Sequence, residues 1–304
     1  MKVVTEVVYL GLYFLYCCLE SVFRICFPPR RKNIAGQNVL VTGAGHGIGR
    51  EIAIELARLG GNLILWDINQ SSNEATANII RAFGGTASAY VCDVSKKDDI
   101  KRLAEQVRRE VGDVDILVNN AGILNGDELL EIDDDDIQKT FDINTMAHFW
   151  TIKEFLPSMI SKNKGHLVCV ASMAGRFGVC YLVDYCASKF AVYGMMEALS
   201  EELRCTGKDG VKTTLVCPTV VDTGIIKIPK DRFNVGMLTA KDTADAAIDG
   251  VLRNKQVVII PRVAGLSICM SLLPRKFVAK LRDFAGIGLF PQYHSNVNVS
   301  RNPR

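Results

Sequence analysis

Eight residues near position 45 constrain the fold of this 304-residue chain more than any other stretch. Thr42 to Gly49 read T-G-A-G-H-G-I-G, directly after the apolar run Val39–Val41 and into an amphipathic run over roughly Gly47–Leu59. A strand, a glycine-rich turn and a helix in that order favour a dinucleotide-binding unit. The glycines let the backbone approach a pyrophosphate, whose charge is attracted to the amino end of the helix.

Further apolar runs continue the alternation of strands and helices. The predicted strands are Asn62–Trp66, Ala87–Cys92, Ile116–Val118, His166–Ala171, Thr213–Cys217 and Val257–Pro261, and Lys97–Glu110 is an amphipathic helix. This alternation predicts an α/β fold with a doubly wound, mostly parallel seven-stranded Rossmann sheet in a single domain. We expect a hydrophobic anchor with a basic flank over residues 1–32, the nucleotide-binding domain over 33–262 and a C-terminal extension over 263–304.

The second predicted strand ends in an acidic residue, Asp67, which follows the glycine-rich turn. A carboxylate at this place can accept hydrogen bonds from both ribose hydroxyls and repels a 2′-phosphate. Ile68 comes next, so no Arg or Lys is positioned there to bind that phosphate. His46 stands where phosphate-preferring proteins often carry a basic residue, but it is mostly neutral at pH 7. The sequence therefore favours NAD(H) over NADP(H).

Tyr185 and Lys189 are four residues apart and would share one face of a helix. An ammonium group about 4 Å from a phenol contributes roughly 4 kcal/mol at an effective dielectric constant of about 20. We therefore expect Lys189 to lower the pKa of Tyr185 toward roughly 7, which suits general acid–base chemistry on an alcohol or carbonyl. Ser172, after the strand that begins at His166, could hold the substrate oxygen by a hydrogen bond.

These features occur in a specific order: T-G-x-x-x-G-I-G, N-N-A-G at 119–122, Asn144, Ser172 and Y-x-x-x-K. Over roughly residues 36 to 262 the chain resembles the short-chain dehydrogenase/reductase family. Finer strings, such as L-W-D-I-N at 65–69 and Y-C-A-S-K-F-A at 185–191, resemble its membrane- and lipid-droplet-associated branch. That branch holds 17-beta-hydroxysteroid dehydrogenases types 11 and 13 and the epidermal retinol dehydrogenases.

The resemblance implies which residues form the site. The implied catalytic set is Ser172, Tyr185, Lys189 and Asn144, with Ser172 and Tyr185 also contacting the substrate. The implied cofactor-binding set is Gly43, Gly45, His46, Gly47, Ile48, Gly49, Asp67, Asp93, Val94, Asn120, Ala121, Gly122, Tyr185, Lys189, Pro218, Val221 and Thr223.

Several of these residues have a more specific expected role. Asn144 should distort its helix and expose a carbonyl to a water that links Lys189 to solvent. For Asn119 and Ala121, a role in the architecture and a cofactor contact are equally open. Asp184 should lie at the solvent or substrate rim, and residues 224–240 should form a substrate lid.

The amino end, Val3–Phe27, is strongly apolar but contains Glu6, Glu20 and Arg24. Its longest charge-free run, Val7–Leu19, would reach about 20 Å as a helix, against a hydrocarbon core of about 30 Å. Three interpretations stay open: a shallow or hairpin-like anchor in one leaflet, a tilted single span, and a soluble helix packed on the domain. The basic cluster at 30–32 predicts a domain that faces the cytosol.

Composition excludes other classes of function. The net charge is only +3 and the basic residues are scattered, so we expect no nucleic acid partner. Ten cysteines form no C-x-x-C pair and the chain has four histidines, so we expect no metal site and a reducing compartment. The acidic run Asp133–Asp136 begins a helix, where it interacts with the helix dipole more often than with a metal.

We therefore expect an NAD-dependent oxidoreductase that interconverts a lipophilic alcohol, of the retinol or 17-beta-hydroxysteroid class, and its carbonyl. The alternative is an NAD-binding membrane or lipid-droplet scaffold with little turnover. We also expect a homodimer on the endoplasmic reticulum membrane or the lipid droplet, attached through the N-terminus. The apolar run Val263–Leu273 could be a core helix, a dimer contact or a second surface that touches the membrane.

Overall fold

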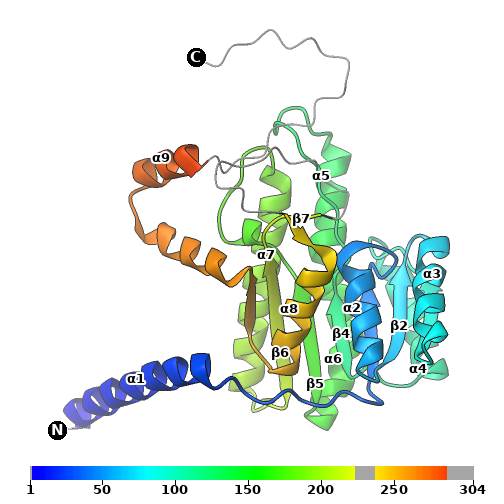
Figure 1. Cartoon of the computed structure of the whole chain (residues 1–304), viewed down its shortest axis with the longest axis horizontal. Helices are drawn as coiled ribbons and strands as arrows, with labels where there is room; N and C mark the ends of the chain where they lie inside the picture. The colour runs from blue at the N-terminus through cyan, green and yellow to red at the C-terminus, as the bar shows by residue number, and fades with distance from the viewer. Residues whose placement is uncertain (1, 223–236, 286–304) are drawn as a thin grey trace.

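The molecule is built around one parallel sheet of seven strands (Figure 1). The computed structural model describes residues 2–222 and 237–285. The strands are β1 Asn38–Thr42, β2 Asn62–Asp67, β3 Thr86–Val91, β4 Ile116–Asn119, β5 Gly165–Val170, β6 Val211–Pro218 and β9 Val257–Ile260. Their order is β3-β2-β1-β4-β5-β6-β9, with every neighbouring pair parallel. The predicted doubly wound Rossmann fold is confirmed.

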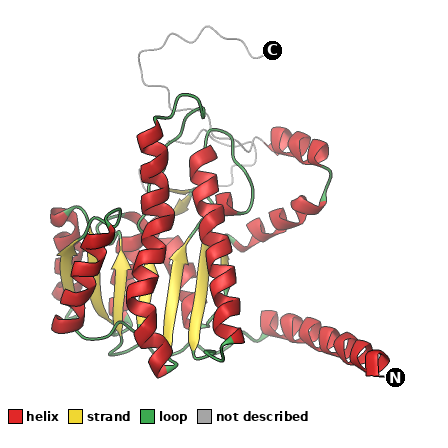
Figure 2. Cartoon of the chain, turned by 180° about the vertical axis from the view of Figure 1, so that it is seen from behind, coloured by secondary structure: helices red, strands yellow, loops and turns green. Residues whose placement is uncertain are grey.

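Helices cover both faces of this sheet, as the two opposite views show (Figures 1 and 2). One face carries α2 Gly47–Arg58, α3 Gln70–Ala82 and α8 Ala240–Leu252, and the other carries α4 Lys97–Glu110, α6 Ala147–Lys162 and α7 Val183–Cys205. Strands covered on both sides bury both sets of side chains, which explains their nearly continuous apolar runs. On the α6 side, the fully buried Trp66 ring lies 5.8 Å from that of Phe155.

The strand order reverses beside β1, which pairs with β2 on one side and with β4 on the other. In doubly wound sheets a ligand binds outside the carboxyl ends of the strands at such a reversal. The glycine-rich turn follows β1, and the N-N-A-G sequence follows β4. Both therefore lie at the place where the topology predicts a binding crevice.

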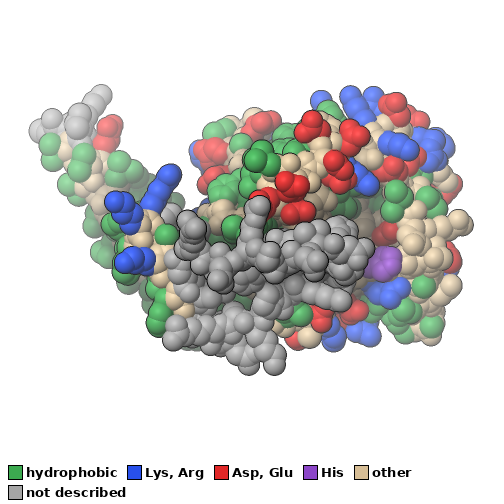
Figure 3. Space-filling model, turned by 90° about the horizontal axis from the view of Figure 1, so that it is seen from above, with side chains coloured by type: hydrophobic (Ala, Val, Ile, Leu, Met, Phe, Trp, Pro, Cys, Tyr) green, Lys and Arg blue, Asp and Glu red, His purple; other side chains and the backbone are tan. Residues whose placement is uncertain are grey.

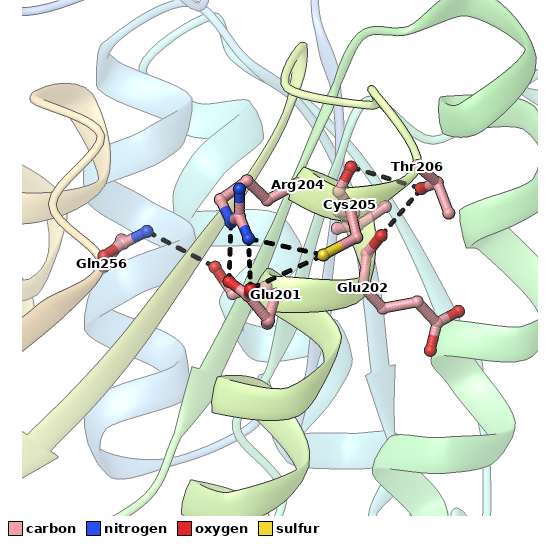
Figure 4. Close-up of polar contacts among 8 residues, drawn as sticks. Glu201, Glu202, Arg204, Cys205, Thr206 and Gln256 are labelled. Carbon is pink, nitrogen blue, oxygen red and sulfur yellow. Dashed lines mark hydrogen bonds and ion pairs between the residues drawn. The ribbon is translucent and has the colours of Figure 1, made fainter. Parts of the chain in front are cut away.

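Local polar contacts stabilise the carboxyl-terminal end of α7 (Figure 4). The Thr206 hydroxyl donates to the Glu202 carbonyl at 2.8 Å, Arg204 Nε donates to Glu201 at 2.8 Å, and Gly207 takes a φ of +68° just beyond. Gln256, which precedes β9, donates to the Ser200 hydroxyl at 3.4 Å. These exposed contacts end the helix near the amino ends of the strands and leave its first turn at the opposite, carboxyl edge.

The amino-terminal helix α1, Lys2–Cys26, projects away from the body (Figure 1). Its stretch Val4–Arg24 is the one described helix that is long and apolar enough to cross a membrane, and none of it is buried. Its 21 residues would span about 32 Å, close to the thickness of a bilayer core. The interpretation of this segment as a soluble helix packed on the domain is therefore wrong, because its apolar side chains remain exposed.

The basic flank that follows α1 is attached to the body. Arg31 forms an ion pair with Asp249 of α8 at 2.8 Å, and the Lys32 backbone donates to the Leu252 carbonyl at 2.8 Å. The Lys32 ammonium lies 2.5 Å from Nδ1 of the buried His166 at the start of β5. Burial lowers the pKa of Lys32 to about 8. Arg31 and Lys32 thus fix the point at which α1 leaves the domain.

The remaining elements flank the carboxyl edge or leave the body. A short parallel pair is formed by β7 Val221–Asp222 and β8 Leu238–Thr239. The helix α5, Asp134–Phe141, leads into a π-helical segment, Asp142–Met146, and a 3₁₀ turn covers Met173–Gly175. After β9 come a 3₁₀ helix, η3 Arg262–Leu272, and α9 Arg275–Ala285.

Candidate active site

The glycine-rich turn between β1 and α2 leaves no room for side chains at two of its glycines. Gly43 has a φ of +66°, and a Cβ there would lie 2.9 Å from the Cα of Ala121. A Cβ on Gly49 would lie 2.1 Å from the Gly43 carbonyl oxygen. The turn therefore packs backbone against backbone, which is the arrangement that lets a phosphate approach the main chain.

The amino end of α2 has no side-chain cap. His46 precedes the helix in an extended conformation, is exposed, and accepts no hydrogen bond from the first turn. The first N–H groups of any helix lack partners within the helix. Gly47 and Ile48 in that turn are only half-buried. This open helix end fits the pyrophosphate of a nicotinamide dinucleotide.

Asp67 ends β2 beside the turn, with a side chain that is 9% exposed. One carboxylate oxygen accepts from the Gly45 backbone at 2.8 Å, and the other accepts from the Asn69 backbone at 2.9 Å. A Cβ on Gly45 would lie 2.5 Å from the Ser72 hydroxyl oxygen and 2.9 Å from the first oxygen, so a side chain here would displace both of these side chains. The carboxylate is held in a fixed place where a ribose could reach it.

Asn120 and Thr42 join the ends of β1 and β4. The Thr42 hydroxyl accepts from the backbone N–H groups of Asn120 at 3.0 Å and Ala121 at 3.1 Å. The Asn120 amide donates to the carbonyls of Thr42 and Gly43 at 3.0 and 3.2 Å. Its side chain thus positions the glycine-rich turn. Asn119 points inward, where it accepts from the Thr151 hydroxyl at 2.8 Å, so its side chain supports the architecture.

Asp93 and Val94 follow β3 at the same edge of the sheet. Val94 is buried, and one oxygen of Asp93 accepts from the backbone and hydroxyl of Ser95 at 3.1 and 2.6 Å. Burial raises the pKa of Asp93, but the Ser95 hydrogen bonds and the nearby Lys96 outweigh it, and the pKa lies below its usual value. Asp93 is therefore an anion with one oxygen bound by Ser95 and the other 3.4 Å from the Lys96 ammonium nitrogen.

Ser172 and Tyr185 meet beside the carboxyl end of β5. Ser172 begins the 3₁₀ turn, and its hydroxyl accepts from the Ala174 backbone at 3.1 Å. Tyr185 lies in the first turn of α7 and is half-buried. Burial raises the pKa of its phenol to about 12, although a side-chain hydrogen bond with Ser172 acts in the opposite direction. The two hydroxyls are close enough to contact one substrate oxygen together.

Lys189 lies one turn beyond Tyr185, and its ammonium nitrogen is 5.7 Å from the centroid of the tyrosine ring. The side chain is 3% exposed and donates to the Val170 carbonyl at 3.1 Å. Desolvation lowers the pKa of Lys189 to about 8. The expectation that the pKa of Tyr185 falls toward 7 is wrong for this structure, because burial of the phenol raises its pKa more than any neighbouring group lowers it.

Asn144 lies in the π-helical segment, so the helix is locally distorted there as expected. Its amide is fully buried and pairs with both backbone groups of Ile123, at 2.8 and 2.9 Å, and it donates to the Ser188 hydroxyl at 3.1 Å. A Cβ on Gly122 would lie 3.2 Å from the Asn144 oxygen and 3.5 Å from the Lys189 nitrogen. Asn144, Gly122 and Lys189 therefore converge, and π-helical segments are frequent at functional sites.

The segment after β6 is only partly described. Pro218 is buried at the end of that strand, and Val221 is half-buried in β7, which pairs with β8. Thr223 and most of the expected lid, residues 224–236, lie outside the described residues. The pairing of Val221 with Leu238 brings the two ends of this segment together beside the carboxyl edge of the sheet.

Two residues near the site were not identified correctly from the sequence. Asp184 is 3% exposed and accepts from Asn125 and the Thr140 hydroxyl, each at 3.0 Å, so its placement at the solvent rim is wrong. His148 is buried with no protein partner for either ring nitrogen, and desolvation followed by the charge of Lys189 lowers its pKa to about 3. Its spacing, one turn after Asn144, was the signal that it faces the site.

A family model described as short chain dehydrogenase matches residues 37–231. The chain belongs to the short-chain dehydrogenase family. It is 42% identical to human 17-beta-hydroxysteroid dehydrogenase 13 over 288 residues, which cover 94% of this chain and 96% of that one. It is also 42% identical to human estradiol 17-beta-dehydrogenase 11, covering 93% and 94%, and to human epidermal retinol dehydrogenase 2, covering 90% of each chain.

Solved structures of short-chain dehydrogenases support the same assignment. A member from Burkholderia phymatum in complex with NAD superposes with a TM-score of 0.73 at 27% identity, over 83% of this chain and 96% of that one. A putative NAD(P)-dependent gluconate 5-dehydrogenase from Beutenbergia cavernae with bound NADP gives 0.66 at 29% identity, over 75% and 96%. This short-chain dehydrogenase is therefore an oxidoreductase with a nicotinamide cofactor.

Proposed function

We propose that this enzyme transfers a hydride between NAD(H) and a lipophilic alcohol or carbonyl of the retinoid or 17-beta-hydroxysteroid class. One observation carries the proposal: Ser172, Tyr185, Lys189 and Asn144 converge at the carboxyl edge of the sheet, beside the open glycine-rich turn. When bound, the nicotinamide supplies or accepts the hydride. The residues of the chain bind and orient the cofactor and the substrate, and they transfer the proton.

The cofactor preference follows from Asp67. Its carboxylate is held 2.8 Å from the Gly45 backbone, where an adenosine ribose would lie in this fold. An anion at that place accepts from ribose hydroxyls and repels a 2′-phosphate. The residue that follows is Ile68, which provides no positive charge to offset this repulsion. We infer a preference for NAD(H).

The proton is handled by Tyr185. With a pKa of about 12, its phenol is protonated at neutral pH in the free protein, which is the form that donates a proton to a carbonyl during reduction. In oxidation the phenolate must take the proton of the alcohol, so a positive charge near the ring is required. Lys189 supplies that charge at 5.7 Å from the ring centroid while its own pKa of about 8 keeps it largely protonated at pH 7.

Ser172 and Asn144 position these groups. The Ser172 hydroxyl hydrogen-bonds with the phenol and can hold the substrate oxygen beside it. Asn144 fixes the loop at Ile123, and its π-helical surroundings can present a carbonyl to a water that connects Lys189 to solvent. The buried ring of His148 adds polar atoms without protein partners near this same lysine.

The substrate class rests on relatives and on the anchor. Proteins named as dehydrogenases of 17-beta-hydroxysteroids, estradiol and retinol are each 42% identical to this chain over the aligned residues. An exposed apolar helix, α1, supports attachment to a membrane, from which a lipophilic substrate would enter. We place the enzyme on the endoplasmic reticulum membrane or the lipid droplet, with its domain in the cytosol. A homodimer is also expected, and sedimentation in detergent would test it.

The proposal is tested by NADH production in detergent-solubilised protein with retinol and with estradiol. Turnover of either alcohol that disappears in Tyr185→Phe would support the proposal and identify the substrate group. Clear NADH binding without turnover of either alcohol would favour a different lipid alcohol or the scaffold function. Efficient turnover in Tyr185→Phe would contradict the proposed chemistry.

A further inference from the structure

The C-terminal extension exposes a stripe of apolar side chains on η3. A 3₁₀ helix has three residues per turn, so residues three apart lie directly above one another. Val263, Leu266 and Leu272 are spaced by multiples of three and are 65%, 71% and 86% exposed. This stripe does not pack into the core, although Ala264 of η3 packs against the core cluster, so η3 lies on the surface of the domain and is not a buried core helix.

The following helix, α9, continues this surface with an amphipathic pattern. Phe277, Leu281 and Phe284 fall on one face of the helix and are 55%, 37% and 56% exposed. Basic residues surround this face: Arg275 and Lys276 begin the helix, and Lys280 lies in its middle, all three exposed. The sequence of α9 holds four basic residues and one acidic residue, so the helix carries a net charge of +3.

This surface lies on the same side of the molecule as α1. The edge strand β9 leads directly into η3, and in both opposite views α1, η3 and α9 extend beyond that edge of the sheet (Figures 1 and 2). In the view from above, apolar and basic side chains gather on this side (Figure 3). Among the described residues, Val263, Leu266 and Leu272 of η3 and Phe277 of α9 each remain more than half exposed.

We propose that the surface formed by η3 and α9 binds an anionic phospholipid surface, the same one into which α1 inserts. An amphipathic helix whose basic residues flank an apolar face lies in the plane of a lipid interface. At 11 residues, α9 is about 16 Å long and cannot cross a hydrocarbon core of about 30 Å, so it binds parallel to the surface. Its charge of +3 complements acidic headgroups.

A second contact has a consequence for the enzyme. Attachment through α1 alone would let the domain rotate about the anchor helix. Arg31 and Lys32 fix the base of α1 on the domain, and the lipid contact of η3 and α9 would fix a second point at the same edge. The domain then takes one orientation on the membrane. This inference builds on α1 as the membrane anchor in the proposed function, but it requires neither NAD nor a particular substrate.

The test places a fluorescent residue on α9 in the full-length protein. Phe277→Trp is bound to vesicles that contain phosphatidylserine and lipids brominated in the acyl chains, which quench tryptophan at short range. The protein has two tryptophans of its own, Trp66, which is fully buried, and Trp150, and α1 contains none. The matched control is Phe83→Trp, a 43% exposed phenylalanine after α3, at the opposite edge of the sheet.

We expect the brominated lipid to remove most of the added fluorescence of Phe277→Trp and none of that of Phe83→Trp. The loss should shrink when phosphatidylcholine replaces phosphatidylserine, and again in Lys276→Glu/Lys280→Glu. Equal quenching of the two tryptophans, or none at either, would overturn the proposal. A further outcome would also overturn the proposal: the tryptophan of Phe277→Trp is not quenched, and Phe277→Glu dissociates a detergent-solubilised dimer. That result would show that the surface binds a second copy of the chain.

Flotation of the same samples separates this inference from the anchor. Protein that floats with vesicles while the tryptophan of Phe277→Trp stays unquenched would leave α1 as the anchor and would reject the second contact alone. Protein that does not float with vesicles of either composition would reject both.

Discussion

The two halves of the active site are held together by different physical means. The turn after β1 is fixed by glycines and backbone hydrogen bonds, and Asp67 is the charged side chain at its centre. Around α7, Tyr185 and Lys189 are removed from water, and burial raises the pKa of the first and lowers that of the second. A motif thus specifies a backbone shape directly, whereas the charge state of a side chain depends on everything packed around it.

The largest effect should come from removing the phenol of the catalytic half. Tyr185→Phe should lower kcat/KM by about 10²- to 10⁴-fold, the contribution that a positioned general acid–base makes. Thermal unfolding should change little, because the ring is retained. The matched control is Tyr193→Phe, two turns further along α7, where the ring packs against Arg176 at 4.2 Å. A comparable loss of kcat/KM in Tyr193→Phe would show that the effect is structural.

The cost of burying Lys189 should appear as a pH-dependent stability. Its pKa is about 8 in the folded protein and 10.5 for an ordinary lysine. Between these values the unfolded chain binds the extra proton, so the free energy of unfolding rises with pH. Urea unfolding measures this effect as the difference in the free energy of unfolding between the wild type and Lys189→Met. This difference should shift in favour of the wild type by up to about 3 kcal/mol from pH 8 to 10.5.

Lys241→Met is the control for this pH dependence. Lys241 is exposed, and hydrogen bonding and charge from Asp245 raise its pKa. Such a group stabilises the fold below its unfolded pKa and loses that contribution as pH rises through its folded pKa. The difference between the wild type and Lys241→Met should therefore fall at alkaline pH. A rise of the same sign as for Lys189→Met would contradict the assignment to burial.

In the glycine-rich turn, stability should depend on the volume of the side chains and not on pH. Gly49→Ala would place a methyl group 2.1 Å from the Gly43 carbonyl, and we expect it to destabilise the fold by about 1–3 kcal/mol, as overpacking does. It should also weaken NADH binding, because the turn must open. Gly194→Ala is the matched control in the middle of α7, where nothing lies within 4 Å of the added carbon. That variant should be stabilised by up to about 1 kcal/mol, and urea unfolding measures both.

The same contrast explains how far the sequence could predict the site. The strands, the glycine-rich turn and the Tyr185–Lys189 face follow from local spacing, and they were predicted correctly. Asp184 was misplaced because its partners, Asn125 and Thr140, lie 59 and 44 residues away in sequence. The pKa of Tyr185 was predicted in the wrong direction for a related reason: desolvation is a property of the whole packed environment. The attraction between Lys189 and a Tyr185 phenolate one helix turn away could be predicted from their spacing in the sequence. The burial of the phenol could not, because it depends on the folded structure.

The smallest expected effect is a change in cofactor preference at Asp67. Asp67→Ala should weaken NADH binding and improve NADPH binding, because the hydrogen bonds to the ribose and the repulsion of the 2′-phosphate are lost together. A tenfold change in the ratio of the two dissociation constants corresponds to about 1.4 kcal/mol. Asp93→Asn is the control at the same edge, where one carboxylate oxygen is already bound to Ser95. Asp93→Asn should weaken the binding of NADH and NADPH by the same factor. If the ratio of the two dissociation constants changes in Asp93→Asn but not in Asp67→Ala, then Asp93, after β3, and not Asp67, at the end of β2, determines the cofactor preference.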